Sequence, residues 1–179
     1  EILEKNAKGK AIKIRVDMGK ANFIAKEVPV NFSKEECVNE PVRFGGKEFR
    51  INCVSVGNPH CVVFRDEIKQ EELLKYGPII ETDKMFPNRT NVQFAHVINR
   101  HLVEIKIWER GVGNTLASGS SSCAVASAMR KNNLVDQDVT IKMPGGELQI
   151  SIDDEWNIKM TGPAQEICSG VFSKEMLEA

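Results

Sequence analysis

The sequence predicts an α+β fold in which a mostly antiparallel or mixed sheet wraps around one buried central helix. Apolar runs of strand length recur along the chain, each bounded by Gly, Asn, Asp or Pro. One helical segment, from about Ser120 to Asn132, is small and apolar on nearly every side until Arg130. A strand-rich chain with one helix buried all round favours this arrangement over alternating βαβ units.

The individual elements follow from these runs. A short polar helix is expected from Lys69 to Tyr76, ended by Gly77-Pro78. Asn99-Arg100 and Gly145-Gly146 each separate two alternating segments closely enough to predict antiparallel hairpins. Strands are expected in segments 11–19, 49–57, 61–66, 90–97, 101–108, 139–143, 148–152, 157–161 and 166–172.

Composition narrows the function classes. The 179 residues suit one domain, or one half of a protein with two similar lobes. The 24 basic and 25 acidic residues form no basic stripe, so a nucleic-acid partner is not expected and a small molecule is. No apolar run reaches the length of about 20 residues that a membrane span needs. The five cysteines lack Cys-x-x-Cys spacing, which favours reduced, mostly buried thiols in a reducing compartment over disulfides or a zinc site.

The most informative segment is Trp108 to Ser118, WERGVGNTLAS, which continues into Gly119 and three serines. Gly111 and Gly113 allow the backbone to turn tightly after the strand, and the serines are typical helix caps. A helix that begins here leaves amides unpaired for an anion. Glu109 suits an ammonium group and Arg110 a carboxylate, so the segment predicts an amino-acid pocket; a solvated surface pair is the alternative.

Two other turns carry polar side chains suited to recognition. Asn58 and His60 lie in GNPH, between two strands that are expected to be buried. Asn91 begins the strand in TNVQF. For His60 the alternative is an ordinary buried histidine, and for Asn91 it is a bond to the neighbouring backbone.

Together, six ordered segments resemble the C-terminal half of the diaminopimelate epimerase family. They are VDMG (16–19), GNPHCV (57–62), TNVQF (90–94), WERGVGNTLASG (108–119), PGGELQI (144–150) and MTGPA (160–164). The resemblance implies a cofactor-independent racemase or epimerase built of two lobes, each a sheet around a central helix, with the substrate between them. It also implies interconversion of LL- and meso-diaminopimelate in the cytoplasm, on the route to lysine and peptidoglycan precursors. Racemases of other amino acids share this plan and remain an alternative.

The resemblance also assigns roles to residues. It implies that Asn58 and Asn91 bind the distal amino-acid end and that Arg110 grips its carboxylate. Glu109 takes the α-ammonium and, with His60, lies near the reacting groups. The amides of Gly119 and Ser120 receive the α-carboxylate. Two acid/base groups, one from each lobe at the start of its helix, exchange the α-proton on opposite faces, with no cofactor and no metal.

One position departs from the family pattern. Where the family has Ala-Cys-Gly-Thr-Gly-Ala-Cys, this chain has Ala117 followed by Ser118, so a hydroxyl replaces the catalytic thiol. A hydroxyl stays protonated where a thiol near a helix N-terminus ionises, so it is a poor base unless another base such as His60 assists it within about 3 Å. Cys123, further along a buried helix, is expected in the core.

Three interpretations of Ser118 stay open. It is a natural variant in an active enzyme, an engineered exchange that inactivates the enzyme, or a mark of a non-catalytic amino-acid-binding module. The further departures at Ser120, Ser121 and Ser122 favour the first, because an engineered exchange would usually change one residue.

The domain boundaries are expected as follows. Residues 1–11 are the end of a missing N-terminal lobe or a linker, residues 12–164 form the C-terminal lobe, and residues 165–179 hold a strand that returns toward the first lobe. Without the first lobe these residues are expected to be inactive alone, and the uncovered sheet edges favour a homodimer.

Overall fold

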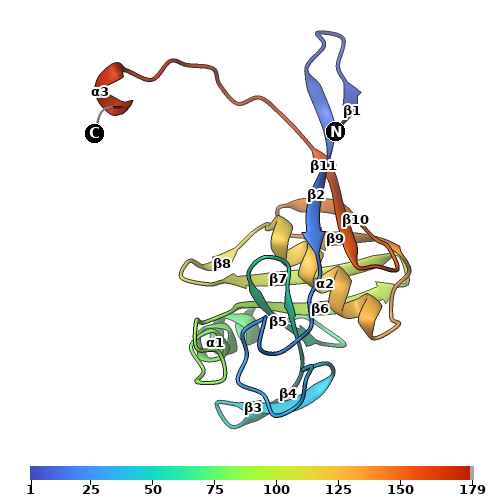
Figure 1. Ribbon diagram of the computed structural model, residues 1–179, viewed down its shortest axis with the longest axis vertical. Helices are drawn as coiled ribbons and strands as arrows, with labels where there is room; N and C mark the ends of the chain where they lie inside the picture. The colour runs from blue at the N-terminus through green and yellow to red at the C-terminus, as the bar shows by residue number, and fades with distance from the viewer. Residues whose placement is uncertain (178–179) are drawn as a thin grey trace.

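The computed structural model describes residues 1–177 and confirms the predicted α+β class, with a mixed sheet around a central helix (Figure 1). The strands are β1 (Ile2–Lys5), β2 (Ala11–Lys20), β3 (Glu40–Phe44), β4 (Lys47–Ser55), β5 (Pro59–Phe64), β6 (Asn91–Asn99), β7 (Leu102–Glu109), β8 (Gly113–Thr115), β9 (Asp138–Met143), β10 (Gly146–Ile152) and β11 (Asn157–Pro163). The helices in this range are α1 (Gln70–Glu81), α2 (Gly119–Lys131) and the short α3 (Lys174–Leu177).

The strands form one sheet in the order β1-β2-β11-β10-β9-β7-β6-β5-β4-β3, with β8 paired to β7 off this path. Two neighbouring pairs are parallel, β5 with β6 and β7 with β9; the other pairs along this path are antiparallel. Both predicted hairpins, β6-β7 and β9-β10, are antiparallel as expected. Because the sheet curls, strands from both its halves pack around α2.

Helix α2 is buried as its sequence predicts. Every side chain from Ser121 to Met129 is buried, and its small residues allow strands to approach on several sides. Ser127, in the middle of the helix, is satisfied because its hydroxyl donates to the carbonyl of Cys123 at 2.8 Å. Arg130 and Lys131 follow in the last turn, where cations suit the negative end of the helix dipole.

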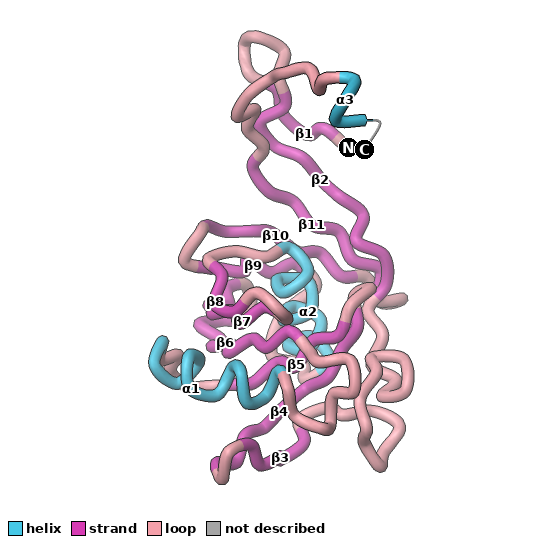
Figure 2. The backbone as a smooth tube through the Cα atoms, turned by 90° about the vertical axis from the view of Figure 1, so that its left-hand side faces the viewer, coloured by secondary structure: helices cyan, strands magenta, loops and turns pink. Residues whose placement is uncertain are grey.

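A second core lies on the other side of the sheet, beneath α1. Alternation along β5 divides the two cores, because Val62 belongs to the α2 core and Cys61 and Val63 to the α1 core. The aromatic ring of Phe49 packs edge-on against Tyr76 of α1, with ring centroids 5.0 Å apart. The sheet is therefore covered by α2 on one face and by α1 on part of the other (Figure 2).

The predicted end of helix α1 at Gly77-Pro78 is wrong, because the helix continues to Glu81. Gly77 faces the ring of Trp108 so closely that a Cβ atom there would lie 2.7 Å from Cγ of the ring. Packing against β7 therefore holds the helix together at this point. Thr82 ends it, with its hydroxyl donating to the carbonyl of Pro78 at 2.8 Å.

The two ends of the chain lie away from the body of the domain. A hairpin of β1 and β2, joined by the end of β11, projects as an arm (Figure 2). The strand predicted at residues 166–172 is absent from the described residues, which have no regular structure from 164 to 173 before α3. Ile167 and Val171 there are 96% and 100% exposed, so no neighbouring strand stabilises an extended pairing. The last two residues of the expected C-terminal strand segment lie outside the described residues.

Three strands were not predicted from the sequence: β1, β3 and β8. Each is short and pairs at an edge of the sheet or beside β7. No helix among residues 1–177 is long and apolar enough to span a membrane.

Candidate active site

The pairing of β5, β6 and β7 brings the predicted polar segments to one end of the sheet. β5 and β6 are parallel, and His60 lies opposite Asn91 in register. β7 runs antiparallel to β6, so its last residue, Glu109, reaches the same end, where β6 begins. The three segments that are far apart in sequence therefore meet here.

Asn91 links β5 and the loop after β7 at this end of the sheet through hydrogen bonds. Its side chain is 3% exposed, its Nδ2 donates to the carbonyl of Pro59 at 2.9 Å, and its Oδ1 accepts from the amide of Arg110 at 3.0 Å. One amide side chain thus links the start of β5 to the loop that follows β7. The side chain therefore bonds backbone groups 32 and 19 residues away in the chain, and not the neighbouring backbone that the sequence offered as the alternative.

His60 is fully buried and both ring nitrogens have partners. Nε2 lies 2.9 Å from Oδ1 of Asn58, and Nδ1 lies 3.0 Å from Nε2 of Gln93. Burial, together with the positive charge of Arg110, lowers the pKa of His60 to about 3. The imidazole is therefore neutral across the physiological range.

Ser118 caps α2, as the serine-rich sequence indicates. Its backbone is extended, with φ −158°, and its Oγ accepts from the amide of Ser121 at 3.4 Å. The amides of Gly119 and Ser120 donate to no acceptor within residues 1–177. The positive end of the α2 dipole and two unpaired amides therefore lie beside the Ser118 hydroxyl.

His60 makes no hydrogen bond to Ser118 in the described residues, so the direct assistance that the sequence raised is not found. The connection runs instead through Gln93, whose Nε2 also donates to Oγ of Ser121 at 3.0 Å. The amide of Ser121 then donates to Ser118 Oγ. Sequence reasoning missed Gln93, because an amide within a strand motif gives no signal of its own.

The last residue of β7, Glu109, and the first residue of the loop after it, Arg110, are both partly exposed. Gly111 has φ +75°, which permits the turn closed by the amide of Val112 donating to the carbonyl of Glu109 at 3.0 Å. Nη1 of Arg110 donates to the carbonyl of Asn88 at 3.1 Å, and within residues 1–177 the two side chains form no ion pair with each other. The two side chains therefore do not neutralise each other by direct contact.

A buried carboxylate that the sequence did not single out holds this loop. Glu81, at the end of α1, is 5% exposed; it accepts from Nε1 of Trp108 at 2.7 Å and from the amide of Gly111 at 2.8 Å. Arg89 adds an ion pair at 3.6 Å. Through Glu81, helix α1 therefore positions the Glu109–Arg110 turn from behind. The only sequence signal of Glu81 is that it is an acid at the end of the apolar run Ile79-Ile80.

The cysteines lie elsewhere and are free thiols. Cys123 is buried in α2, as expected, and burial raises its pKa to about 12. The contact with Cys53, followed by burial, raises the pKa of Cys37. The contact with Cys37 lowers the pKa of Cys53, but its contact with Cys61 and its burial outweigh this, so the pKa of Cys53 is raised. Cys168 is exposed on the segment that leaves the domain. Within residues 1–177 no group of three or more His, Cys, Asp or Glu side chains is arranged to hold a metal ion.

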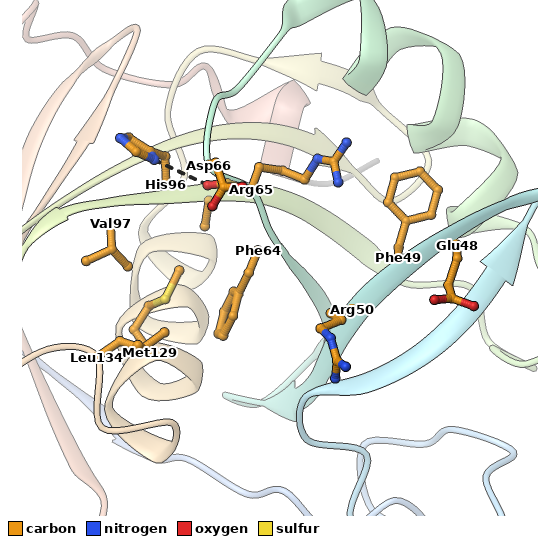
Figure 3. Close-up of a pocket in the computed structure, with 11 residues that line it drawn as sticks. Glu48, Phe49, Arg50, Phe64, Arg65, Asp66, His96, Val97, Met129 and Leu134 are labelled. Atoms are coloured by element: carbon orange, nitrogen blue, oxygen red, sulfur yellow. Dashed lines mark hydrogen bonds between the residues drawn. The ribbon is translucent and has the colours of Figure 1, made fainter.

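A cavity of about 550 Å³ lies at the opposite ends of β5 and β6, beside the last turn of α2 (Figure 3). Phe64, Val97 and Met129 give it an apolar wall, and Nδ1 of His96 donates to the carbonyl of Arg65 at its edge, at 3.2 Å. None of the predicted site residues lines it. It is therefore separate from the Ser118 site.

The fold places the chain in a class. A sheet is wrapped around a buried helix, and solved amino-acid racemases and epimerases share this fold. In this chain the helix N-terminus lies at the same end as an Asn-His turn and a Glu-Arg loop. A hydroxyproline epimerase from Agrobacterium vitis, solved with trans-4-hydroxy-L-proline, matches with a TM-score of 0.60 at 11% identity, over 89% of this chain and 52% of that one. A probable proline racemase from Agrobacterium radiobacter matches with a TM-score of 0.58 at 10% identity, over 87% and 52%.

The chain belongs to the diaminopimelate epimerase family. The family model for diaminopimelate epimerase matches residues 52–167. "Diaminopimelate epimerase 2" of Nostoc sp. is 41% identical over 98% of this chain and 61% of its own length, and a diaminopimelate epimerase of Geobacillus sp. is 38% identical over 92% and 59%. The resemblance seen in the sequence is confirmed. The chain spans about 60% of the length of the curated relatives it matches.

Proposed function

We propose that this chain supplies one half of the active site of an amino-acid epimerase that interconverts LL- and meso-diaminopimelate without a cofactor. The observation that carries the proposal is the meeting of two carboxylate-binding features at one end of the sheet. One is the α2 N-terminus with its unpaired Gly119 and Ser120 amides, and the other is the guanidinium of Arg110. A substrate with a carboxylate at each end fits two such features.

In this proposal the α-carboxylate binds the α2 amides and the distal carboxylate binds Arg110, with Asn58 and Asn91 at the distal end. Glu109 takes the α-ammonium. When the Cα–H bond breaks, its proton passes to a base on one face and the electron pair spreads into the α-carboxylate. The Gly119 and Ser120 amides stabilise the charge that develops there.

A proton returned to the opposite face completes the inversion. We assign that face to the Ser118 hydroxyl, which lies at the same helix N-terminus, accepts from the Ser121 amide at 3.4 Å and is partly exposed. The oxygen that has given its proton to the α-carbon takes one back from water. The partner acid/base belongs to a second lobe outside residues 1–179; the greater length of the curated relatives supports this. On this view the chain alone is inactive.

The test is α-hydrogen exchange of LL-diaminopimelate in heavy water, measured by mass spectrometry on the full-length protein. Ser118→Ala should abolish exchange, whereas Ser118→Cys should raise it about 10-fold or more, since a thiol near a helix N-terminus ionises near neutral pH. Ser33→Cys, in an exposed loop, is the control for adding a thiol. Exchange that is unchanged in Ser118→Ala would exclude Ser118 from the reaction.

A second candidate, a non-catalytic amino-acid-binding module, is favoured by the hydroxyl at position 118. The binding residues do not need a thiol, so the site would hold an amino acid without inverting it. Calorimetry that shows micromolar binding of diaminopimelate by the full-length protein, together with no exchange even in Ser118→Cys, would favour this function. Binding of a different amino acid in preference would favour a racemase of another substrate.

The cellular compartment and the oligomeric state of the protein are also proposals. The free cysteines support a reducing compartment, and we propose the cytoplasm. The projecting arm of β1 and β2 leaves an open sheet edge, which supports a homodimer. Sedimentation velocity of the full-length protein at several concentrations tests the assembly.

A further inference from the structure

Gln93 lies between the two halves of the site and has no solvent exposure. It projects from β6, and its Nε2 is 3.0 Å from Nδ1 of His60 and 3.0 Å from Oγ of Ser121. An amide NH2 group has two hydrogens and accepts none, so both of its hydrogens are used here. With the Gln93 amide in this orientation, Nδ1 of His60 is the acceptor.

The direction of this bond fixes the next one. A neutral imidazole carries one proton, and with Nδ1 accepting, that proton lies on Nε2. Nε2 therefore donates to Oδ1 of Asn58, at 2.9 Å. The Oδ1 atom of Asn58 is occupied inward, and its Nδ2, which makes no hydrogen bond within residues 1–177, is left for a ligand.

We propose that Gln93 is a positioning residue that sets the tautomer of His60 and thereby turns the NH2 group of Asn58 toward the substrate carboxylate. The proposal rests on the proposed function for the identity of the substrate, although the tautomer itself does not depend on it. The hydrogen bonds that link Gln93, His60 and Asn58 have one alternative arrangement, in which donor and acceptor exchange places in each bond. In that case Nδ1 of His60 donates to Gln93 and Asn58 presents a carbonyl oxygen, which repels a carboxylate.

The cost of Gln93 supports a role beyond packing. Its Oε1 is buried and has no hydrogen-bond partner within residues 1–177. A buried, unpaired acceptor costs about 1–3 kcal/mol, a cost that an apolar side chain at this position would not carry. Both bonds that the amide does make go to site residues, His60 and Ser121.

The neutrality of His60 makes its tautomer decisive. A protonated imidazole would donate from both nitrogens, so the hydrogen bonds would no longer run in one direction from Gln93 through His60 to Asn58. Burial keeps the ring neutral. Arg110 is the charged side chain that acts on His60, and its positive charge also disfavours the protonated ring.

The tautomer is measured directly by 15N NMR of the histidine side chains, without substrate. In the wild type we expect His60 to carry its proton on Nε2. In Gln93→Glu the carboxylate only accepts, so the proton should move to Nδ1; in Gln93→Leu the preference should be lost and the two nitrogen shifts should converge. Gln149→Glu, on an exposed strand position, is the matched control and should leave His60 unchanged.

A binding measurement connects the tautomer to recognition. On the full-length protein, Gln93→Glu should weaken diaminopimelate binding by about 10-fold through the reversed Asn58 amide, with the α-hydrogen exchange rate at saturation changing less. A proton found on Nδ1 in the wild type, or a tautomer unchanged in both Gln93 variants, would overturn the proposal. The wild-type NMR spectrum needs no variant and no substrate. The tautomer of His60 can therefore be determined even if the proposed function is wrong.

Discussion

At His60, burial makes the protein sensitive to acid. The folded-state pKa is lowered to about 3, whereas a histidine in an unfolded chain titrates near 6.5. Between these values the unfolded chain binds a proton that the folded chain does not. The free energy of unfolding should therefore fall as the pH is lowered from about 6.5 toward 3, by up to about 1.4 kcal/mol per pH unit from this residue.

Urea denaturation at several pH values between 7 and 4 measures that slope. His60→Gln, which removes the titrating group, should show a smaller fall in stability per pH unit than the wild type. His101→Gln is the control, since His101 lies on the surface. Equal slopes in the wild type and His60→Gln would show that His60 is not the group responsible.

Residues whose role follows from a local pattern were predictable from the sequence, and residues whose role depends on a distant partner were not. Ser118 was predicted as a helix start because serines cap helices, and it is the N-cap. Gln93 and Glu81 act through His60, Ser121, Trp108 and Gly111, which come together only after the sheet forms. No local signal marks Gln93 in advance, and the place of Glu81 after an apolar run does not reveal its partners.

At the scale of elements, strong alternating runs predicted most strands and both hairpins. A strand with one buried face alternates apolar and polar residues, and this pattern is visible in the sequence. The end of α1 was mispredicted for a physical reason. Gly77-Pro78 normally stops a helix, but here Gly77 is the contact point for Trp108 of β7, and packing outweighs local preference.

Gly77→Ala tests that contact. Alanine favours a helix by about 1 kcal/mol, but its Cβ would lie 2.7–2.9 Å from three atoms of Trp108, and overpacking of this kind costs about 1–3 kcal/mol. We expect a net loss of stability of about 1 kcal/mol in chemical denaturation. Gly170→Ala, with open space around it, should change stability little. A variant at position 77 as stable as the wild type would refute the close approach.

At the scale of the whole molecule, the body of the domain and the segment after β11 differ in protection. Residues 164–173 have no regular structure, and Phe172 is 68% exposed. Proteases cut such segments first. Limited chymotrypsin digestion of this chain should cleave after Phe172 before any site in the body, as mass spectrometry of the fragments over time will show; earlier cleavage within β4–β7 would contradict this.

The pairing of β2 with β11 has a consequence for how the chain folds. Arg15 and Thr161 are partners in this pair although 146 residues separate them, so the sheet is completed only when both ends of the chain are present. Pairings this distant in sequence slow folding, because the entropy of closing a long loop comes before the gain from contacts. During synthesis α2 emerges before β9, β10 and β11, and the part of its apolar surface that these three strands cover stays exposed until they follow. A nascent chain at this stage is a natural client for chaperones.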